Sequence, residues 1–251
     1  MVGLTNQFRY SADLPEQGEP RIGEELIQVR HGDGRTEELR LHDYGRLYSI
    51  PGLYERIVHE RLGCRSPAQI ASMLGEAVDR IAWERGAVRV IDLAAGNGIS
   101  GAALAAQGLR PVLGTDIVTT ARAAALRDRP HVYDAYRTLD LLDLDPTEEQ
   151  AIADLRANAL TCVAPVGTAS QQLPPLAVTA VARLLAPDAL IAYMHDPRLG
   201  VSDELEPALI RGQLGDGIGI EQLDRRRYLH RYTVSGRPYE MDGVVLRVRR
   251  G

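Results

Sequence analysis

The feature that most constrains this chain is a short apolar run that breaks into three regularly spaced glycines. Residues 90–93 form the run, and Gly96, Gly98 and Gly101 follow with the spacing G-x-G-x-x-G. An alanine-rich segment that favours helix comes next. Glycine lets a backbone turn tightly and approach a ligand closely, and the free N–H groups of a helix start then face that ligand. The pattern predicts a strand, a glycine turn and a helix.

An acidic residue completes the pattern. A second apolar strand begins at Pro111 and ends at Asp116, about twenty residues after Gly96. A nucleotide-binding βαβ unit places a carboxylate there to bind ribose hydroxyls. Glycine-rich turns also occur simply as turns. Here the strand, turn, helix, second strand and terminal acid agree, so the sequence predicts a nucleotide-type cofactor.

Residues 92–98 carry a family resemblance. Dinucleotide-binding strands are usually apolar up to the first glycine, whereas Asp92 stands four residues before Gly96. D-L-A-A-G-N-G resembles the first motif of the class I S-adenosylmethionine (SAM)-dependent methyltransferases. The resemblance is specific over residues 88–118 and looser to about residue 196. It implies that Asp92 lies near the ammonium group of SAM, that the glycines pass under the methionine moiety, and that Asp116 binds the ribose.

The same resemblance implies further cofactor contacts. A polar residue after the third strand often meets the adenine amino group, with the next residue beside the ring. SAM is the expected cofactor and S-adenosylhomocysteine (SAH) the expected product. The expected cofactor-binding residues are Tyr48, Asp92, Ala94, Gly96, Asn97, Gly98, Asp116, Ile117, Asp140, Leu141 and Ala164. Asp140, Asp143 and Asp145 also fit a solvated acidic loop, and this alternative stays open.

Composition excludes several classes of function. All 29 basic residues are arginine, which excludes a P-loop lysine, a Schiff-base lysine and a lysine general base. The net charge of −5 argues against a nucleic acid partner. Two distant cysteines give no disulfide framework or zinc site, which is consistent with a reducing cytoplasm. No apolar run has membrane-spanning length, and no signal-peptide core is seen. No spacing demands a metal, although a carboxylate-bound Mg²⁺ stays open.

The first third of the chain is expected to form an arm and a lid. Residues 1–35 are polar and glycine-interrupted and predict a loop, with a short helix at 24–29. Residues 36–85 predict helices, one of them opening at Ser66-Pro67 with the serine as N-cap. In the family such an extension covers cofactor and substrate. Tyr44, Tyr48 and Tyr54 lie in it, and each has core packing as its alternative role.

The rest of the chain predicts an alternating βα pattern with a parallel sheet. Strands are expected at 88–93, 111–115, 138–139, 159–163 and 189–194, and helices at 101–107, 119–127, 147–158 and 175–185. Segments 224–232 and 239–249 predict an antiparallel hairpin, and residues 198–219 a short helix and loop near the substrate. The expected fold is α/β and Rossmann-like, the class I methyltransferase fold. It has a seven-stranded, mostly parallel sheet with a C-terminal antiparallel hairpin and an N-terminal helical lid. An arm and lid at 1–86 precede a SAM-binding core at 87–251.

Methyl transfer to a small-molecule acceptor is the expected activity. Residues 164–167 lack the D/N-P-P-[FYW] signature of enzymes that methylate amino groups of bases or glutamine. His195, at the end of the fifth strand, is the candidate general base, with a hydrogen-bonded structural histidine as its alternative. His42 and Tyr44 are rival bases. An NAD(P)-dependent oxidoreductase and a non-catalytic SAM-binding protein stay open as functions. No nucleic acid or membrane partner is expected, and a homodimer is compatible with the sequence.

Overall fold

The computed structural model describes residues 9–18, 20–167, 173–199, 214 and 217–250. The chain begins with a small antiparallel sheet of order β1-β2-β3, formed by Tyr10–Asp13, Leu26–His31 and Thr36–Arg40. The helix expected at 24–29 is therefore wrong. Ile27 and Val29 are fully buried while Gln28 between them is not, so burial alternates with the period of a strand.

Three helices connect this sheet to the core. They are α1 (Tyr44–Ser49), the π-helix η1 (Glu55–Arg61) and α2 (Ser66–Arg80). The N-cap of α2 is Arg65, not Ser66. The Ser66 hydroxyl lies 2.6 Å from Nδ1 of His230 and accepts a hydrogen bond from Tyr228, so tertiary contacts replace the expected cap.

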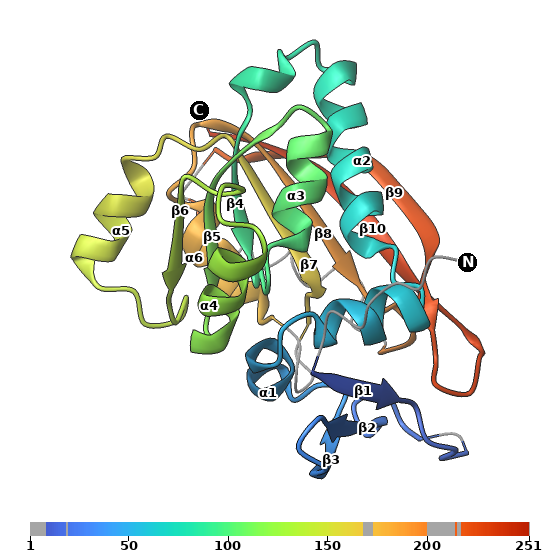
Figure 1. Cartoon of the computed structure of the whole chain (residues 1–251). Coiled ribbons are helices and arrows are strands. Elements are labelled where there is room, and N and C mark those ends of the chain that lie inside the picture. The colour runs from blue at the N-terminus through green and yellow to red at the C-terminus, as the bar shows by residue number, and fades with distance from the viewer. Residues whose placement is uncertain (1–8, 19, 168–172, 200–213, 215–216, 251) are drawn as a thin grey trace.

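The main sheet has seven strands in the order β6-β5-β4-β7-β8-β10-β9. Strands β4 to β8 are parallel, and β10 runs antiparallel to both β8 and β9 (Figure 1). This confirms the expected fold class. The strands are Arg89–Leu93 (β4), Arg110–Asp116 (β5), Ala135–Thr138 (β6), Ala159–Pro165 (β7), Asp188–His195 (β8), Gly219–Tyr232 (β9) and Pro238–Arg249 (β10).

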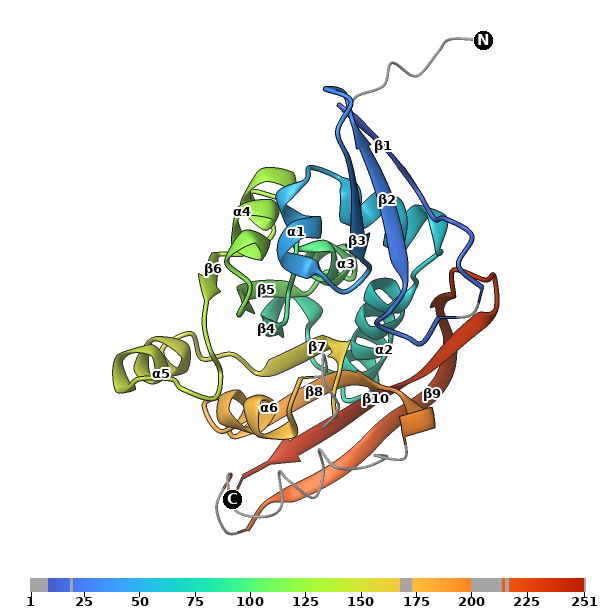
Figure 2. The same cartoon turned by 90° about the horizontal axis from the view of Figure 1, so that it is seen from below.

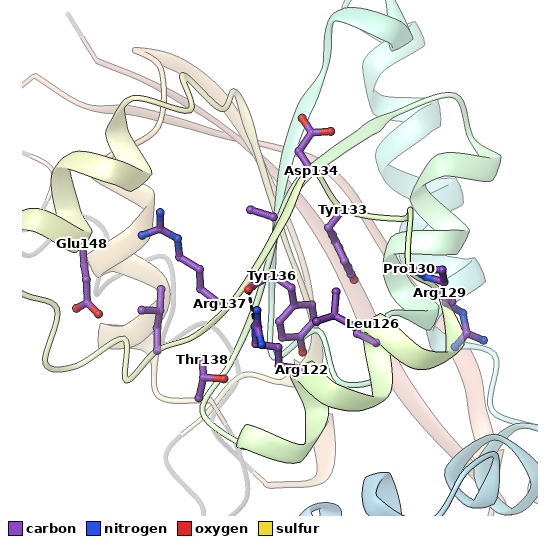
Figure 3. Close-up of a pocket in the computed structure, with 13 residues that line it drawn as sticks. Arg122, Leu126, Arg129, Pro130, Tyr133, Asp134, Tyr136, Arg137, Thr138 and Glu148 are labelled. Carbon is purple, nitrogen blue, oxygen red and sulfur yellow. Dashed lines mark hydrogen bonds between the residues drawn. The ribbon is translucent and has the colours of Figure 1, made fainter.

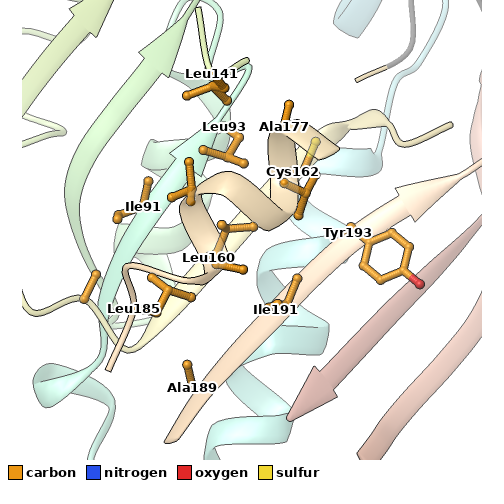
Figure 4. Packing of buried hydrophobic residues seen from close by; sticks show 14 of the residues in the cluster. Ile91, Leu93, Leu141, Leu160, Cys162, Ala177, Leu185, Ala189, Ile191 and Tyr193 are labelled. Carbon is orange, nitrogen blue, oxygen red and sulfur yellow. The ribbon is translucent and has the colours of Figure 1, made fainter. Parts of the chain in front are cut away.

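Helices cover both faces of the sheet. They are α3 (Ile99–Ala106), α4 (Thr119–Asp128), α5 (Pro146–Ala153) and α6 (Pro175–Ala182), with a 3-10 turn η2 at Arg85–Ala87 and another, η3, at Pro197–Leu199. Ile152 of α5 and Val178 of α6 belong to the core on one face, which contains Ile91, Leu160 and Ile191 (Figure 4).

The opposite face is covered by α2 and α3 (Figure 2). Helix α2 packs closely on β10. If Gly243 of β10 carried a Cβ, that atom would lie 2.7 Å from the sulfur of Met73 in α2. Residues of α2 thus share a buried cluster with the strands of the main sheet. Helix α1 lies at the carboxyl ends of the strands (Figure 1), and η1 contacts the turn that follows β4 through Glu55 and Asn97.

The C-terminal hairpin confirms the expected reversed strand pair, with each strand beginning earlier than predicted. Three consecutive arginines of β9 form ion pairs. Arg225 and Arg227 both pair with Asp242, and Arg226 pairs with Glu76 and Asp224. Most of the helix and loop expected at 198–219 lies outside the described residues.

Candidate functional site

The glycine turn between β4 and α3 has the backbone conformation that its glycines suggest. Gly96 and Gly98 have φ angles of +53° and +83°. Ala94, which carries a Cβ, also has a positive φ of +51°. A residue with a Cβ in the left-handed region costs about 1–2 kcal/mol. The turn is therefore locally strained, and strain of this kind gathers at functional sites.

Asp116 ends β5 beside this turn. One carboxylate oxygen accepts a hydrogen bond from the Gly96 N–H at 3.0 Å, and the other accepts from the Val118 N–H at 2.9 Å. Burial raises the pKa of Asp116, and these backbone N–H groups act in the opposite direction. The two elements predicted to share a ligand are thus adjacent in space.

Asp92 has a different environment from the expected one. It is 0% exposed, and three hydroxyl groups donate to its carboxylate, those of Ser100 at 2.5 Å, Tyr133 at 2.6 Å and Thr161 at 2.8 Å. Burial raises its pKa. The carboxylate therefore joins β4, β7, α3 and the segment before β6. Its expected contact with the cofactor ammonium stays a prediction, and the described contacts already occupy both oxygens.

Tyr133 and Tyr136, which the sequence did not single out, explain why glycine stands at positions 101 and 114. A Cβ on Gly101 would lie 2.4 Å from the ring of Tyr133, and one on Gly114 would lie 2.9 Å from the rings of Tyr133 and Tyr136. The Tyr136 hydroxyl also donates to the carbonyl oxygen of Gly96 at 2.6 Å. Close approach by protein rings is therefore one reason for glycine here. No sequence signal separates this reason from close approach by a ligand.

The lid closes over the turn from the other side. A Cβ on Gly96 would lie 2.4 Å from the Tyr48 hydroxyl. The ring of Tyr48 stacks on Tyr44 at a centroid distance of 5.9 Å and contacts Tyr54 at 5.1 Å. Burial raises the pKa of all three phenols, so each is protonated at neutral pH. The structure brings together the three tyrosines expected on the lid.

A polar contact that the sequence did not indicate fastens the lid to the turn. Glu55, at the start of η1, accepts hydrogen bonds from the side-chain amide of Asn97 at 2.9 Å and from Arg129 at 2.8 Å. Arg129 also donates to the Asn97 carbonyl oxygen at 3.1 Å. The Oδ1 atom of Asn97 is buried and has no hydrogen-bond partner among the described residues. A buried acceptor of this kind suits a ligand donor.

The remaining predicted cofactor residues lie around the ends of β5, β6 and β7. Ile117, next to Asp116, is 65% exposed. Leu141 is buried, whereas Asp140 is exposed and accepts a hydrogen bond from the Leu142 N–H. Ala164 lies near the end of β7 and is half-buried. Asp145 caps α5 and Asp143 is exposed, in line with the solvated-loop alternative for both.

His195 ends β8, as expected, and is 4% exposed. Its Nε2 lies 3.0 Å from the guanidinium of Arg225, which can only donate, so the Nε2 lone pair is engaged. The neighbouring Asp196 binds Arg198 and accepts from the Tyr239 hydroxyl, and so does not orient His195. These contacts favour the structural alternative, while the catalytic role of His195 stays a prediction.

A cavity lies between edge strand β6 and helix α4. It has a volume of about 760 Å³ and lies beside edge strand β6, with residues of α4 and the start of α5 in its wall (Figure 3). Arg122 in this wall donates to the carbonyl oxygen of Tyr136. The wall contains neither Asp116 nor the glycines. Arg129 and Tyr133 in this wall contact the glycine turn, so the cavity borders the predicted cofactor residues without including them.

The residues around the turn have the chemistry that SAM needs. Asp116 offers a carboxylate for ribose hydroxyls, Ile117 an uncovered apolar surface for adenine, and Asn97 an unpartnered acceptor. The Tyr48 hydroxyl occupies the space beside Gly96 in this structure. In the described part of the chain, no group of three or more His, Cys, Asp or Glu side chains is placed to bind a metal. No described helix is long and apolar enough to cross a membrane.

Comparisons with known proteins give matches in structure only. No family model matches the chain, and no curated protein matches it in sequence. The 1,6-didemethyltoxoflavin-N1-methyltransferase of Burkholderia thailandensis, solved with its substrate and SAH, is 14% identical with a TM-score of 0.50, over 95% of this chain and 100% of that one. The N-methyltransferase NodS of Bradyrhizobium japonicum, solved with SAH, is 10% identical with a TM-score of 0.47, over 71% and 85% of the two chains. A ribosomal protein L11 methylase of Lactobacillus delbrueckii is 19% identical with a TM-score of 0.45, over 72% and 78%.

The likeness to the toxoflavin enzyme extends over nearly the whole of both chains. Together with the strand order, it establishes that this chain has the fold of the class I SAM-dependent methyltransferases.

Proposed function

We propose that this protein is a SAM-dependent methyltransferase that acts on a small-molecule acceptor. The observation that carries the proposal is the position of Asp116. It ends the strand next to β4 and contacts the glycine turn at Gly96, on a sheet whose order reverses at β4. In open α/β sheets, ligands bind outside the carboxyl ends of the strands at such a switch point.

The strand order weighs against an NAD(P)-dependent oxidoreductase. A dinucleotide-binding fold of the usual order has parallel strands throughout, whereas here the antiparallel β10 lies between β8 and β9. The fold's solved relatives with bound SAH support the same choice. The acidic net charge and the 95% coverage by a small-molecule enzyme support a small-molecule acceptor over nucleic acid.

The chain's residues supply binding and positioning. Asp116 would bind the ribose hydroxyls, Ile117 would lie against adenine, and the glycine turn would let the methionine moiety approach the backbone. When bound, SAM supplies an electrophilic methyl group on a sulfonium. The lid tyrosines would exclude water and align the acceptor, and alignment of this kind contributes much of the rate of such a transfer.

Lid movement is part of this proposal. Tyr48 lies on Gly96, and its carbonyl oxygen accepts from Arg127 of α4, while Thr120 of α4 donates to the Gly45 carbonyl oxygen. These contacts link α1 to α4, and they must loosen when the cofactor enters. We further propose that residues 1–86 act on the 87–251 core as arm and lid, with the moving part ending before Ser66, because α2 is packed on the sheet.

One observation favours the second candidate, a SAM-binding protein without turnover. The contact between Nε2 of His195 and the guanidinium of Arg225 favours a structural role for the base predicted from sequence. Calorimetric titration with SAM, SAH and NADH tests the cofactor, and binding of the first two alone supports the proposal. Binding of NADH alone would overturn it. Turnover of radiolabelled SAM with metabolite pools then separates enzyme from binder.

A further inference from the structure

A histidine on η1 has the geometry of a base. Nδ1 of His59 lies 3.3 Å from the carbonyl oxygen of Cys64. A carbonyl oxygen only accepts, so this contact assigns the proton to Nδ1 and leaves the lone pair on Nε2. Nε2 is buried and has no hydrogen-bond partner among the described residues. The carbonyl thus fixes the tautomer, as an orienting group does for a catalytic histidine.

The unpartnered nitrogen calls for a ligand. Burying a polar atom without a partner destabilises the fold, because the atom loses its hydrogen bonds to water. Such exceptions in native structures often mark functional positions. His59 also lies on a π-helix, an irregular form that is frequent at functional sites. Burial lowers the pKa of His59, so the ring is neutral at pH 7 and able to take a proton.

His59 is connected to the candidate cofactor site through aromatic rings. Its ring meets that of Tyr54 edge to face at 5.7 Å, and Tyr54 contacts Tyr48, which lies on Gly96. Glu55, four residues before His59 on the same helix, binds Asn97 of the glycine turn. A row of aromatic rings therefore connects the turn to the histidine, and such rings would stack on a planar acceptor.

The charged groups near Tyr54 and His59 are paired with each other, Arg129 with Glu55 and Arg231 with Glu25. Arg231 and Glu25 form a bidentate ion pair, with side chains 4% and 1% exposed. Burial lowers the pKa of His42 and lowers that of His230 to about 3, so both rings are uncharged at pH 7. An ionic acceptor would lose its hydration here without gaining a partner of opposite charge, which disfavours its binding.

We propose that His59 is the general base of the methyl transfer and that the acceptor is an uncharged, flat-ring compound whose O–H or ring N–H faces Nε2. This inference rests on the proposed function. The acceptor atom forms a bond to the methyl carbon as the carbon–sulfur bond breaks. The electron pair of that bond stays on sulfur, which changes from sulfonium to thioether. The proton of the acceptor moves to Nε2 of His59.

The other histidines under the lid fit this role less well. Nε2 of His195 already accepts from Arg225. Nδ1 of His230 lies 2.6 Å from the Ser66 hydroxyl. His42 has a buried Nδ1 without a partner among the described residues, but no described hydrogen bond fixes its tautomer. Only His59 combines a free lone pair with an orienting carbonyl.

A pair of variants tests the inference. His59→Asn places a side-chain amide where Nδ1 stood, so it keeps a donor for the Cys64 carbonyl oxygen but removes Nε2. The matched control is His131→Asn, which changes an exposed histidine outside the site. The probes are substituted phenols and a heteroaromatic N–H compound, with benzoate and phenethylammonium as charged counterparts. Calorimetry of each probe with the SAH-loaded protein and transfer from radiolabelled SAM are both measured.

We expect neutral probes to bind and to be methylated in preference to charged ones. His59→Asn should lower kcat by about 10²–10⁴ with SAH affinity within a few fold. The reduction of kcat should be smaller for more acidic phenols, because they lose their proton more readily without a base. A loss of equal size for all phenols, an unchanged kcat, or a preference for charged probes would overturn the inference. The inference would also be overturned if the protein bound SAH but bound none of the neutral probes. Failure of the wild type to bind SAH would instead reject the proposed function.

Discussion

The hydroxyl of Tyr133 donates a hydrogen bond to the carboxylate of Asp92 at 2.6 Å, across 41 residues of sequence. It also accepts from the Gly101 N–H at 3.1 Å, so one phenol joins the strand-end acid to the helix that follows the turn. Asp92 is fully buried. The stability of the turn therefore depends on a residue outside the motif.

Replacing Tyr133 by phenylalanine should destabilise the fold. The change removes one of three donors to a buried carboxylate, and such a loss costs about 1–3 kcal/mol. Denaturant unfolding measures it. Tyr232→Phe, at an exposed tyrosine, is the control and should stay within about 0.5 kcal/mol. Equal stability of the two variants would show that Ser100 and Thr161 suffice for Asp92.

Gly101→Ala should also be destabilising, for steric reasons. Its Cβ would lie 2.4 Å from the ring of Tyr133 and 2.5 Å from Val132. Overpacking of this kind costs about 1–3 kcal/mol. Gly86→Ala is the matched control, because the nearest atom there is 4.0 Å away, at the flexible end of Glu84. A melting temperature for Gly101→Ala equal to that of the control would mean that Tyr133 moves freely.

Asp116→Ala should weaken SAH binding by roughly ten- to a hundredfold, because charge-assisted hydrogen bonds to ribose are worth about 1.5–3 kcal/mol. Calorimetry measures the affinity, and circular dichroism checks the fold. Asp134→Ala, at a surface carboxylate paired with Arg110, is the control and should bind as the wild type does. Unchanged affinity of the Asp116 variant would remove this residue from the site.

Glu25→Gln should cost about 3–5 kcal/mol of unfolding free energy, because it leaves the buried charge of Arg231 without its partner. For the same reason, deletion of residues 1–40 should destabilise the core, since it removes Glu25. The exposed pair of Glu221 and Arg249 is the comparison, and Glu221→Gln should cost at most about 1 kcal/mol. A double Glu25→Leu, Arg231→Met variant should recover stability. If Glu25→Gln costs no more than Glu221→Gln, the ion pair contributes little.

Stability should fall as the pH drops from 7 to 5, in part through His230. Burial lowers its pKa to about 3 in the folded state, whereas an unfolded histidine titrates near 6.5. The unfolded chain binds the proton first, so the folded state loses stability below pH 6.5. For this group alone the loss is about 2 kcal/mol at pH 5. His230→Asn should flatten the slope between pH 7 and 5, and an unaltered slope would contradict the assignment.

Local sequence determined the central βα units and their order. The apolar runs, the glycine turn and Asp116 act over a few residues, because backbone geometry and hydrophobic period are local properties. The reversed hairpin followed from its alternation of apolar and charged residues. The N-terminal strands were missed because five glycines and prolines interrupt residues 18–34, and only burial against the lid shows their period.

Tertiary structure alone decided how the site is assembled. Tyr133 contacts Asp92 and Gly101, Glu55 contacts Asn97, and Glu25 contacts Arg231 from the far end of the chain. No spacing encodes these contacts, because each joins residues that come close only after the sheet and lid have packed. The same packing decided which histidines keep a free lone pair. Hydrogen-bond partners such as Arg225 and the Cys64 carbonyl are set by the folded geometry, not by neighbours in sequence.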